Sequence, residues 1–250
     1  MHPILFNFMG LEIHSFGFFY AIAFIIGIFS TIYYAKKEGI EAQAILDLAL
    51  YVMLACIIGP RLFYVLGDWN YFINNPIEII MVQHGGMVFV GGLVFSLATI
   101  FIFAKIKKIA LLKLFDAIAP GVAFGYAIGR IGCLLNGCCF GLPTTLPWGI
   151  IFPAGSLASL YCKAGESLHP TQIYAAASMF LVFLFLAWLY KRKRFDGQIM
   201  AWWAILYALY RFLVEFLRYS PVHWLNLTPT QWLILPLLIV GIWILKRQNI

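Results

Sequence analysis

Residues 114–135 read LFDAIAPGVAFGYAIGRIGCLL, an apolar stretch interrupted near its end by Arg130. A helix of this length rises about 33 Å, enough to cross the roughly 30 Å of hydrocarbon in a bilayer. Comparable apolar stretches occupy residues 16–34, 47–66, 87–104, 171–190, 198–217 and 230–245. The sequence therefore predicts an all-α integral membrane protein with about seven transmembrane helices.

The composition supports this class. The chain is 63% hydrophobic, 18% aromatic and only 11% charged, which is more apolar surface than a water-soluble fold can bury. Its net charge of +7 comes from short basic clusters between apolar stretches, so we expect a membrane topology signal and no nucleic-acid partner. We expect residues 1–250 to form a single polytopic membrane domain.

The basic clusters also predict an orientation. They follow alternate spans, at residues 36–37, 105–108, 191–194 and 246–247. Because lysine and arginine concentrate on the cytoplasmic side, we expect the N-terminus outside and the C-terminus in the cytoplasm. The longer connections, rich in glycine and proline, then lie outside.

Four arginines depart from this pattern, since they fall inside spans or at their outer ends. A guanidinium in hydrocarbon costs about 2.5 kcal/mol or more and stays charged, so each needs a carboxylate, backbone carbonyls or a lipid phosphate. Function is the default interpretation of such residues, which are Arg61, Arg130, Arg211 and Arg218.

One stripe of the 198–217 span combines charge and aromatic character. Tyr207, Arg211, Glu215 and Arg218 are spaced so that they share a helix face. One interpretation is a structural ion pair from Glu215 to Arg211 or Arg218. For Arg211 we favour ligand binding.

The end of the 114–135 span suggests a second polar site. Its glycines at 125, 129 and 132 have the spacing of close helix packing. Arg130 and Asn136 are better explained by contact with a phosphate, through the planar guanidinium and the side-chain amide.

Two further segments flank spans. QHGGMVFVGG at residues 83–92 suggests a re-entrant or broken helix that lines the site, with tight packing as the alternative. His169-Pro-Thr-Gln172 opens the 171–190 span, and we favour a structural role for His169 over that of a base.

Five segments together resemble the bacterial prolipoprotein diacylglyceryl transferase family, over essentially the whole chain. They are Gly59-Pro-Arg61-Leu-Phe-Tyr64, Gly85-Gly-Met with Gly91-Gly92, Gly129-Arg-Ile-Gly with Asn136-Gly, His169-Pro-Thr-Gln, and Arg211-Phe-Leu-Val-Glu215-Phe. The resemblance implies an enzyme of the bacterial inner membrane whose site faces the outer leaflet. It implies transfer of the diacylglyceryl group of phosphatidylglycerol to the lipobox cysteine in the signal peptide of a preprolipoprotein, with release of glycerol phosphate.

The resemblance also implies site residues. Arg130, Asn136, Tyr207 and Arg211 match positions assigned to substrate binding or catalysis, and Glu215 and His169 stand in matching surroundings. We expect substrate contacts from Arg61, Gly91 and Gly92 as well. Phosphatidylglycerol, the lipoprotein signal peptide and membrane lipids are the implied partners.

The chain departs from the family pattern where a histidine is usual, at Val90, and also at Phe16, Cys133 and Cys138. We interpret Arg130 and Arg211 as a catalytic clamp on the phosphate, and we expect this clamp to contribute more to catalysis than the base does. His84 is the first candidate for a substitute base and His169 the second. The departures leave two alternatives, a transferase with another acceptor and a non-catalytic lipid-binding or transport protein.

The cysteines are Cys56, Cys133, Cys138, Cys139 and Cys162. They lack the paired spacing of a zinc site, so we expect no metal and no cofactor. A disulfide from Cys138 or Cys139 to Cys162, unreactive packing, and covalent catalysis by Cys133 or Cys138 remain open alternatives.

Overall fold

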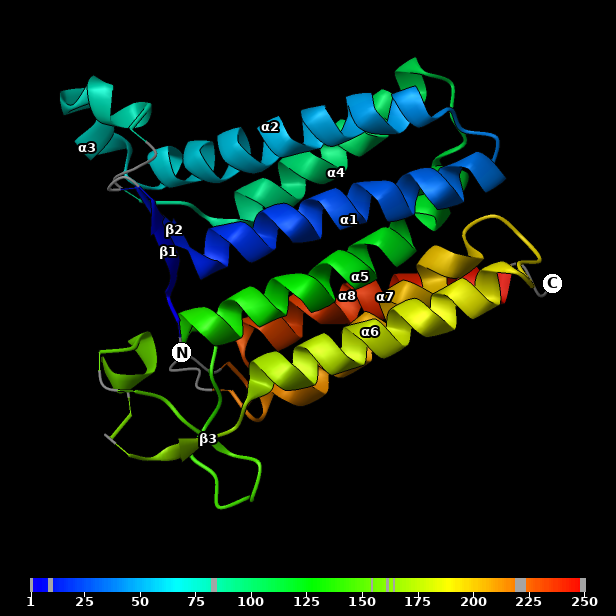
Figure 1. Cartoon of the computed structure of the whole chain (residues 1–250). Helices are drawn as coiled ribbons and strands as arrows, with labels where there is room; N and C mark the ends of the chain where they lie inside the picture. The colour runs from blue at the N-terminus through cyan, green and yellow to red at the C-terminus, as the bar shows by residue number, and fades with distance from the viewer. Residues whose placement is uncertain are drawn as a thin grey trace. The chain divides into compact units, whose positions relative to one another are not determined.

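The structure is a computed structural model that describes residues 2–8, 11–81, 85–153, 155–160, 162–163, 165–218 and 224–247. Helices dominate it (Figure 1). The long ones are α1 (Ser15–Lys37), α2 (Ala42–Gly67), α4 (Phe89–Ile106), α5 (Leu111–Asn136), α6 (Thr171–Tyr190), α7 (Gln198–Glu215) and α8 (Pro229–Arg247). Short elements complete it, namely β1 (Ile4–Phe8), β2 (Leu11–His14), α3 (Trp69–Asn74), η1 (Pro76–Ile79), β3 (Ile150–Ile151), η3 (Leu157–Leu160) and β4 (Ser167–Leu168).

Six of these helices are long and apolar enough to cross a membrane: α1, α2, α4, α5, α6 and α8. The seventh expected span, 198–217, is present as α7. This helix carries Arg211 and Glu215 among its apolar residues. The prediction of an all-α, multi-pass membrane protein is confirmed.

The chain divides into two compact units, which are described separately. One unit combines residues 1–34 with residues 115–250 and contains most of α1, most of α5, and α6 to α8. The other unit, residues 35–114, contains α2, α3, η1 and α4. The predicted site residues are therefore distributed over both units.

Glycines allow α1 and α5 to pack closely in the first unit. A Cβ atom added to Gly125 would lie 2.9 Å from the carbonyl oxygen of Ala23, and one added to Gly132 would lie 2.9 Å from Cβ of Phe19. Gly129 has only ordinary contacts, at 3.8 Å from the Tyr20 ring. Close packing is thus confirmed for Gly125 and Gly132.

A buried carboxylate anchors the start of α7 in the same unit. Asp116 accepts hydrogen bonds from the backbone N–H groups of Gly197 (2.7 Å) and Met200 (2.9 Å). Its oxygen also lies 2.9 Å from Nζ of Lys193. Because a carboxylate at a helix N-terminus satisfies unpaired N–H groups, Asp116 links α5 to α7.

In the second unit α2 packs against α4 through another glycine contact. A Cβ on Gly91 would lie 2.3 Å from the carbonyl oxygen of Gly59. The backbone before α4 is irregular, with positive φ angles at Gly85 and Gly86, and the helix starts at Phe89. Residues 85–88 form irregular backbone and no re-entrant helix, while residues 83–84 of the expected re-entrant or broken helix lie outside the described residues.

Candidate active site

The stripe predicted on α7 contains an ion pair. Nη1 of Arg211 lies 2.6 Å from Oε2 of Glu215, and only 5% of the Glu215 side chain is exposed. The spacing of four residues places the two groups on the same helix face. Of the two partners considered for Glu215, the structure selects Arg211.

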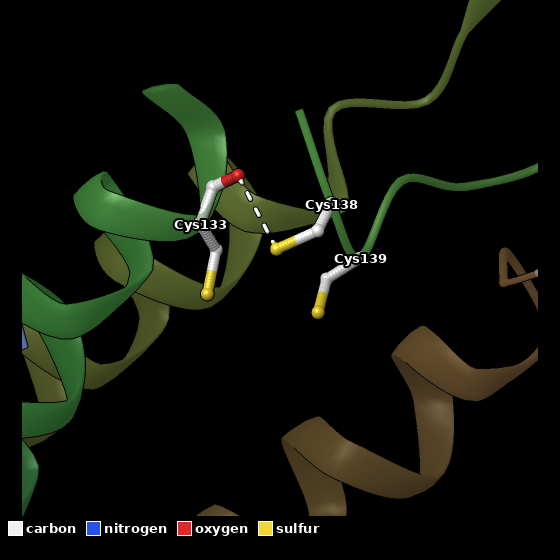
Figure 2. A group of neighbouring side chains, drawn as sticks. All are labelled: Cys133, Cys138 and Cys139. Atoms are coloured by element: carbon white, nitrogen blue, oxygen red, sulfur yellow. Dashed lines mark hydrogen bonds between the residues drawn. The ribbon is translucent and has the colours of Figure 1, made fainter. Parts of the chain in front are cut away.

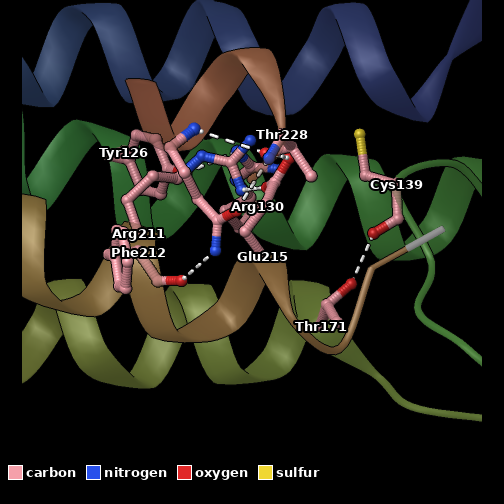
Figure 3. A network of polar contacts seen from close by, with 9 residues as sticks. Tyr126, Arg130, Cys139, Thr171, Arg211, Phe212, Glu215 and Thr228 are labelled. Carbon is pink, nitrogen blue, oxygen red and sulfur yellow. Dashed lines mark hydrogen bonds and ion pairs between the residues drawn. The ribbon is translucent and has the colours of Figure 1, made fainter. Parts of the chain in front are cut away.

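A second helix holds the other oxygen of Glu215. The hydroxyl of Thr228, the residue before α8, donates to Oε1 of Glu215 at 3.0 Å (Figure 3). Thr228 and Gln231 also cap α8 reciprocally, since Gln231 N–H donates to the Thr228 hydroxyl and Thr228 N–H donates to Oε1 of Gln231 at 2.8 Å. Sequence analysis missed both residues, although Thr228-Pro-Thr-Gln231 has the pattern of a capping box.

Arg130, on α5, has an aromatic environment. Its guanidinium lies 4.6 Å from the centroid of the Tyr126 ring, and Nη2 donates to the hydroxyl of the same tyrosine. The Tyr126 ring contacts Tyr207 of α7 edge to face at 5.8 Å. Arg130 is thus placed by stacking, and most of its N–H donors are not used by the hydrogen bonds that the structure describes.

Tyr126 connects Arg130 to α7. Its hydroxyl accepts a hydrogen bond from Arg130, and its ring contacts Tyr207, four residues before Arg211. Trp203 stacks on Tyr207 at 5.2 Å, and its indole N–H is buried without a hydrogen-bond partner among the described residues. Arg130 on α5 and Arg211 on α7 lie in one group of polar side chains (Figure 3), and Tyr207 joins this group through its ring contact with Tyr126.

Asn136 is the last residue of α5 and is half-buried. The chain turns directly after it, because Gly137 has a φ of 70°. Asn136 therefore lies at the C-terminal end of the helix that carries Arg130. Its predicted contact with a phosphate stays a prediction.

His169 belongs to a loop network. Its Nδ1 lies 3.3 Å from the Tyr174 hydroxyl, which accepts a hydrogen bond from Trp148 Nε1 at 2.8 Å. The Tyr174 hydroxyl is therefore available to donate to Nδ1 of His169. This geometry favours the structural role; His84, the other candidate base, lies outside the described residues.

Arg61, a predicted substrate contact, lies in the second unit, and its hydrogen-bond partners differ from those of Arg130. The five N–H groups of Arg61 face five backbone carbonyls, which belong to residues 78, 79, 81, 85 and 86. A guanidinium has five N–H donors, so all of them are engaged. Gly91 and Gly92 are buried against α2, where a Cβ on Gly92 would lie 3.0 Å from Pro60. Substrate binding by these three residues stays a prediction.

All five cysteines are free thiols, so no disulfide to Cys162 is formed. Cys162 packs against the buried cluster of Phe152, Ala158 and Leu168, and burial raises its pKa. Hydrogen bonds with Cys133 and Cys138, followed by the charges of Arg218 and Arg130, lower the pKa of Cys139 below its usual range. Cys162 therefore packs in a half-buried position, and its lack of reactivity stays a prediction.

The fold and the site together define a multi-pass membrane protein with an arginine site inside its helices. The chain belongs to the prolipoprotein diacylglyceryl transferase family, because the family model of that description matches residues 3–247.

Curated relatives agree with this assignment. The chain is 33% identical to a phosphatidylglycerol–prolipoprotein diacylglyceryl transferase of Finegoldia magna, over 97% of this chain and 94% of the relative. It is 33% identical to one of Clostridium tetani, over 98% and 96%. It is 34% identical to one of Cupriavidus metallidurans, over 99% and 94%. The resemblance inferred from the five sequence segments is thus confirmed at the level of the family.

Proposed function

We propose that this chain transfers the diacylglyceryl group of phosphatidylglycerol to the thiol of a lipobox cysteine in a preprolipoprotein, in the bacterial inner membrane with its site toward the outer leaflet. Family membership favours this function over a non-catalytic lipid-binding or transport role. The structural observation that carries it is the pair Arg130 on α5 and Arg211 on α7, whose helices are linked by Tyr126, which binds Arg130 and contacts Tyr207. Two guanidinium groups at one site fit a phosphodiester.

The reaction defines what the site must do. The acceptor sulfur forms a bond to a glyceryl carbon, the bond from that carbon to the phosphate oxygen breaks, and glycerol phosphate leaves with the bonding electron pair. The thiol proton passes to a base or to water. The product is a thioether.

Arg130 is suited to bind the departing phosphate. Stacking on Tyr126 fixes the guanidinium plane while leaving N–H groups to fork onto two phosphate oxygens. A preorganised donor in a dry site is worth about 3 to 4 kcal/mol of barrier, whereas deprotonating a thiol of pKa about 8.5 at pH 7 costs about 2 kcal/mol. The arginines therefore supply the larger share of the catalysis.

Arg211 contributes differently. Its ion pair with Glu215, which Thr228 holds in turn, fixes the side chain on the α7 face that carries Tyr207. The Glu215 charge also offsets one of the two arginine charges in the empty site. When the phosphate binds, Arg211 has N–H groups beyond the one paired to Glu215 with which to contact it.

A lipidation assay tests the proposal. The purified protein is incubated with phosphatidylglycerol and a lipobox peptide, and a matched peptide carries serine in place of the cysteine. A diacylglyceryl mass shift is expected on the cysteine peptide alone, and only when phosphatidylglycerol is present. An unmodified cysteine peptide, with phosphatidylglycerol still bound to the protein, would favour another acceptor or a non-catalytic role.

A further inference from the structure

Three cysteines that the proposed mechanism leaves unused converge near the site. Every pair of sulfur atoms among Cys133, Cys138 and Cys139 lies within 4.8 Å. Figure 2 shows one sulfur coming from the end of α5 and two from the turn that follows it. With metal–sulfur bonds of about 2.3 Å, tetrahedral ligands lie about 3.8 Å apart, so a small contraction brings the three sulfurs around one ion.

The backbone of this turn is fixed from elsewhere in the fold. Cys139 has a φ of 63°, in the left-handed region that residues other than glycine rarely adopt. The Thr171 hydroxyl donates to the carbonyl of Cys139 at 2.6 Å, and Nε2 of Gln172 donates to that of Cys138 at 2.7 Å. The strained backbone at Cys139 is therefore kept in place by two side chains of α6, which bind its own carbonyl and that of the preceding residue.

The donor set selects the class of ion. Three thiolates are soft ligands, which favour zinc and other thiophilic ions over magnesium or calcium. Two oxygens lie beside the sulfurs: the backbone carbonyl oxygen of Cys133, 3.6 Å from the Cys138 sulfur, and the Tyr20 hydroxyl, 3.9 Å from the Cys133 sulfur.

Three protein ligands leave a fourth position open. Structural zinc sites are closed by four protein ligands, whereas sites with three accept a ligand from outside. A thiol that coordinates such an ion loses its proton outright. The substrate of the proposed reaction is itself a thiol.

We propose that Cys133, Cys138 and Cys139 bind a thiophilic divalent ion such as Zn²⁺, whose fourth position takes the acceptor cysteine of the lipoprotein substrate as a thiolate. This inference rests on the proposed function. On coordination the acceptor thiol releases its proton to water. The sulfur electron pair then forms the bond to the glyceryl carbon as the carbon–oxygen bond to phosphate breaks, which accounts for activity without a histidine at Val90.

The first measurement is metal content. The full-length protein, purified in detergent under reducing conditions and loaded with Zn²⁺, is expected to hold about one ion per chain by elemental analysis. Each of Cys133→Ser, Cys138→Ser and Cys139→Ser should weaken Zn²⁺ binding at least about tenfold. Cys56→Ser and Cys162→Ser are matched controls outside the cluster and should bind as the unaltered protein does. In the unaltered protein loaded with Zn²⁺, three cluster thiols that still react with a thiol reagent, or a disulfide within the cluster, would show that the metal site is wrong. This result does not depend on whether a variant folds.

The second measurement follows the acceptor. Co²⁺ bound at the site should show sulfur-to-cobalt charge-transfer absorption that increases when a cysteine lipobox peptide is added and not when its serine counterpart is. An unchanged spectrum contradicts the open position. Lipidation by the metal-free protein at full rate overturns the inference but leaves the proposed function standing. If the ion binds and the spectrum responds to the cysteine peptide, but no lipidation occurs, the metal site is supported and the proposed function is wrong.

Discussion

Arg61 and Arg130 both lie in apolar helices, each next to a glycine-rich segment, yet the structure uses them in opposite ways. Arg61 is 6% exposed, and all its N–H groups donate to backbone carbonyls of η1 and of the segment between η1 and α4. Arg130 makes one described hydrogen bond and stacks on a ring. The cost of burying a guanidinium is met internally in the first case, whereas the second retains donors for an anion.

Replacing Arg130 by lysine should have the largest effect. Lysine keeps the charge but lacks the planar fork, so we expect transfer to fall about 100-fold or more in kcat, with the unfolding temperature nearly unchanged. The rate of peptide lipidation is the measurement. Arg192 stacks on Trp188 at 4.3 Å in the same i, i+4 arrangement and is exposed, so Arg192→Lys is the matched control and should retain full activity. Near-normal transfer by Arg130→Lys would refute the phosphate clamp.

Arg61→Lys should act on stability. An ammonium has three donors and cannot reach five carbonyls, so we expect a loss of about 3 kcal/mol of unfolding free energy. Thermal unfolding in detergent measures it, and KM for the lipid should stay the same in the fraction that folds. An increased KM without a loss of stability would show instead that Arg61 binds substrate.

Glu215→Gln tests whether the ion pair positions Arg211. The amide oxygen still accepts from Thr228, but the charge is lost, so we expect about a tenfold loss of transfer together with about 2 kcal/mol of stability. The single variant Arg211→Gln and the variant with both substitutions complete a double-mutant cycle. If the two substitutions have additive effects on kcat, Arg211 and Glu215 act independently and the positioning role is wrong.

Thr228→Ala should have a smaller effect, since it removes the cap of α8 and one hydrogen bond to Glu215. Loss of a helix cap costs about 1 kcal/mol, which the unfolding temperature records. Thr230→Ala, two residues further and inside α8, is the control. Equal destabilisation by the two variants would show that the reciprocal cap contributes little.

His169→Gln should have the smallest effect on chemistry. A general base contributes about 100-fold or more, whereas a histidine that only supports Tyr174 should leave kcat within about threefold and its pH profile unshifted. The pH dependence of transfer from pH 5 to 8 is the measurement. A large loss of kcat at every pH would restore His169 as the base.

The sequence predicted well those features that depend on interactions between residues close together in the chain. All seven expected spans are helices, with ends within about five residues of the expected ones, because apolar runs of bilayer length permit little else. The Arg211–Glu215 pair could also be predicted from the sequence, because helical periodicity places residues four apart on one face. Before α4, the sequence suggested a re-entrant or broken helix, and the structure shows irregular backbone over residues 85–88, with positive φ angles at Gly85 and Gly86.

By itself the sequence determined the membrane class, the positions of the helices, and which charged residues lie within them. Only the tertiary structure decided what those residues contact. The carbonyls around Arg61 come from a loop 17 to 25 residues away, and Thr228 reaches Glu215 from the start of another helix. The convergence of Cys133 with Cys138 and Cys139 depends on a turn fixed by α6. Helix formation is dictated by local periodicity and the cost of unpaired backbone in hydrocarbon, whereas these contacts depend on how distant segments pack.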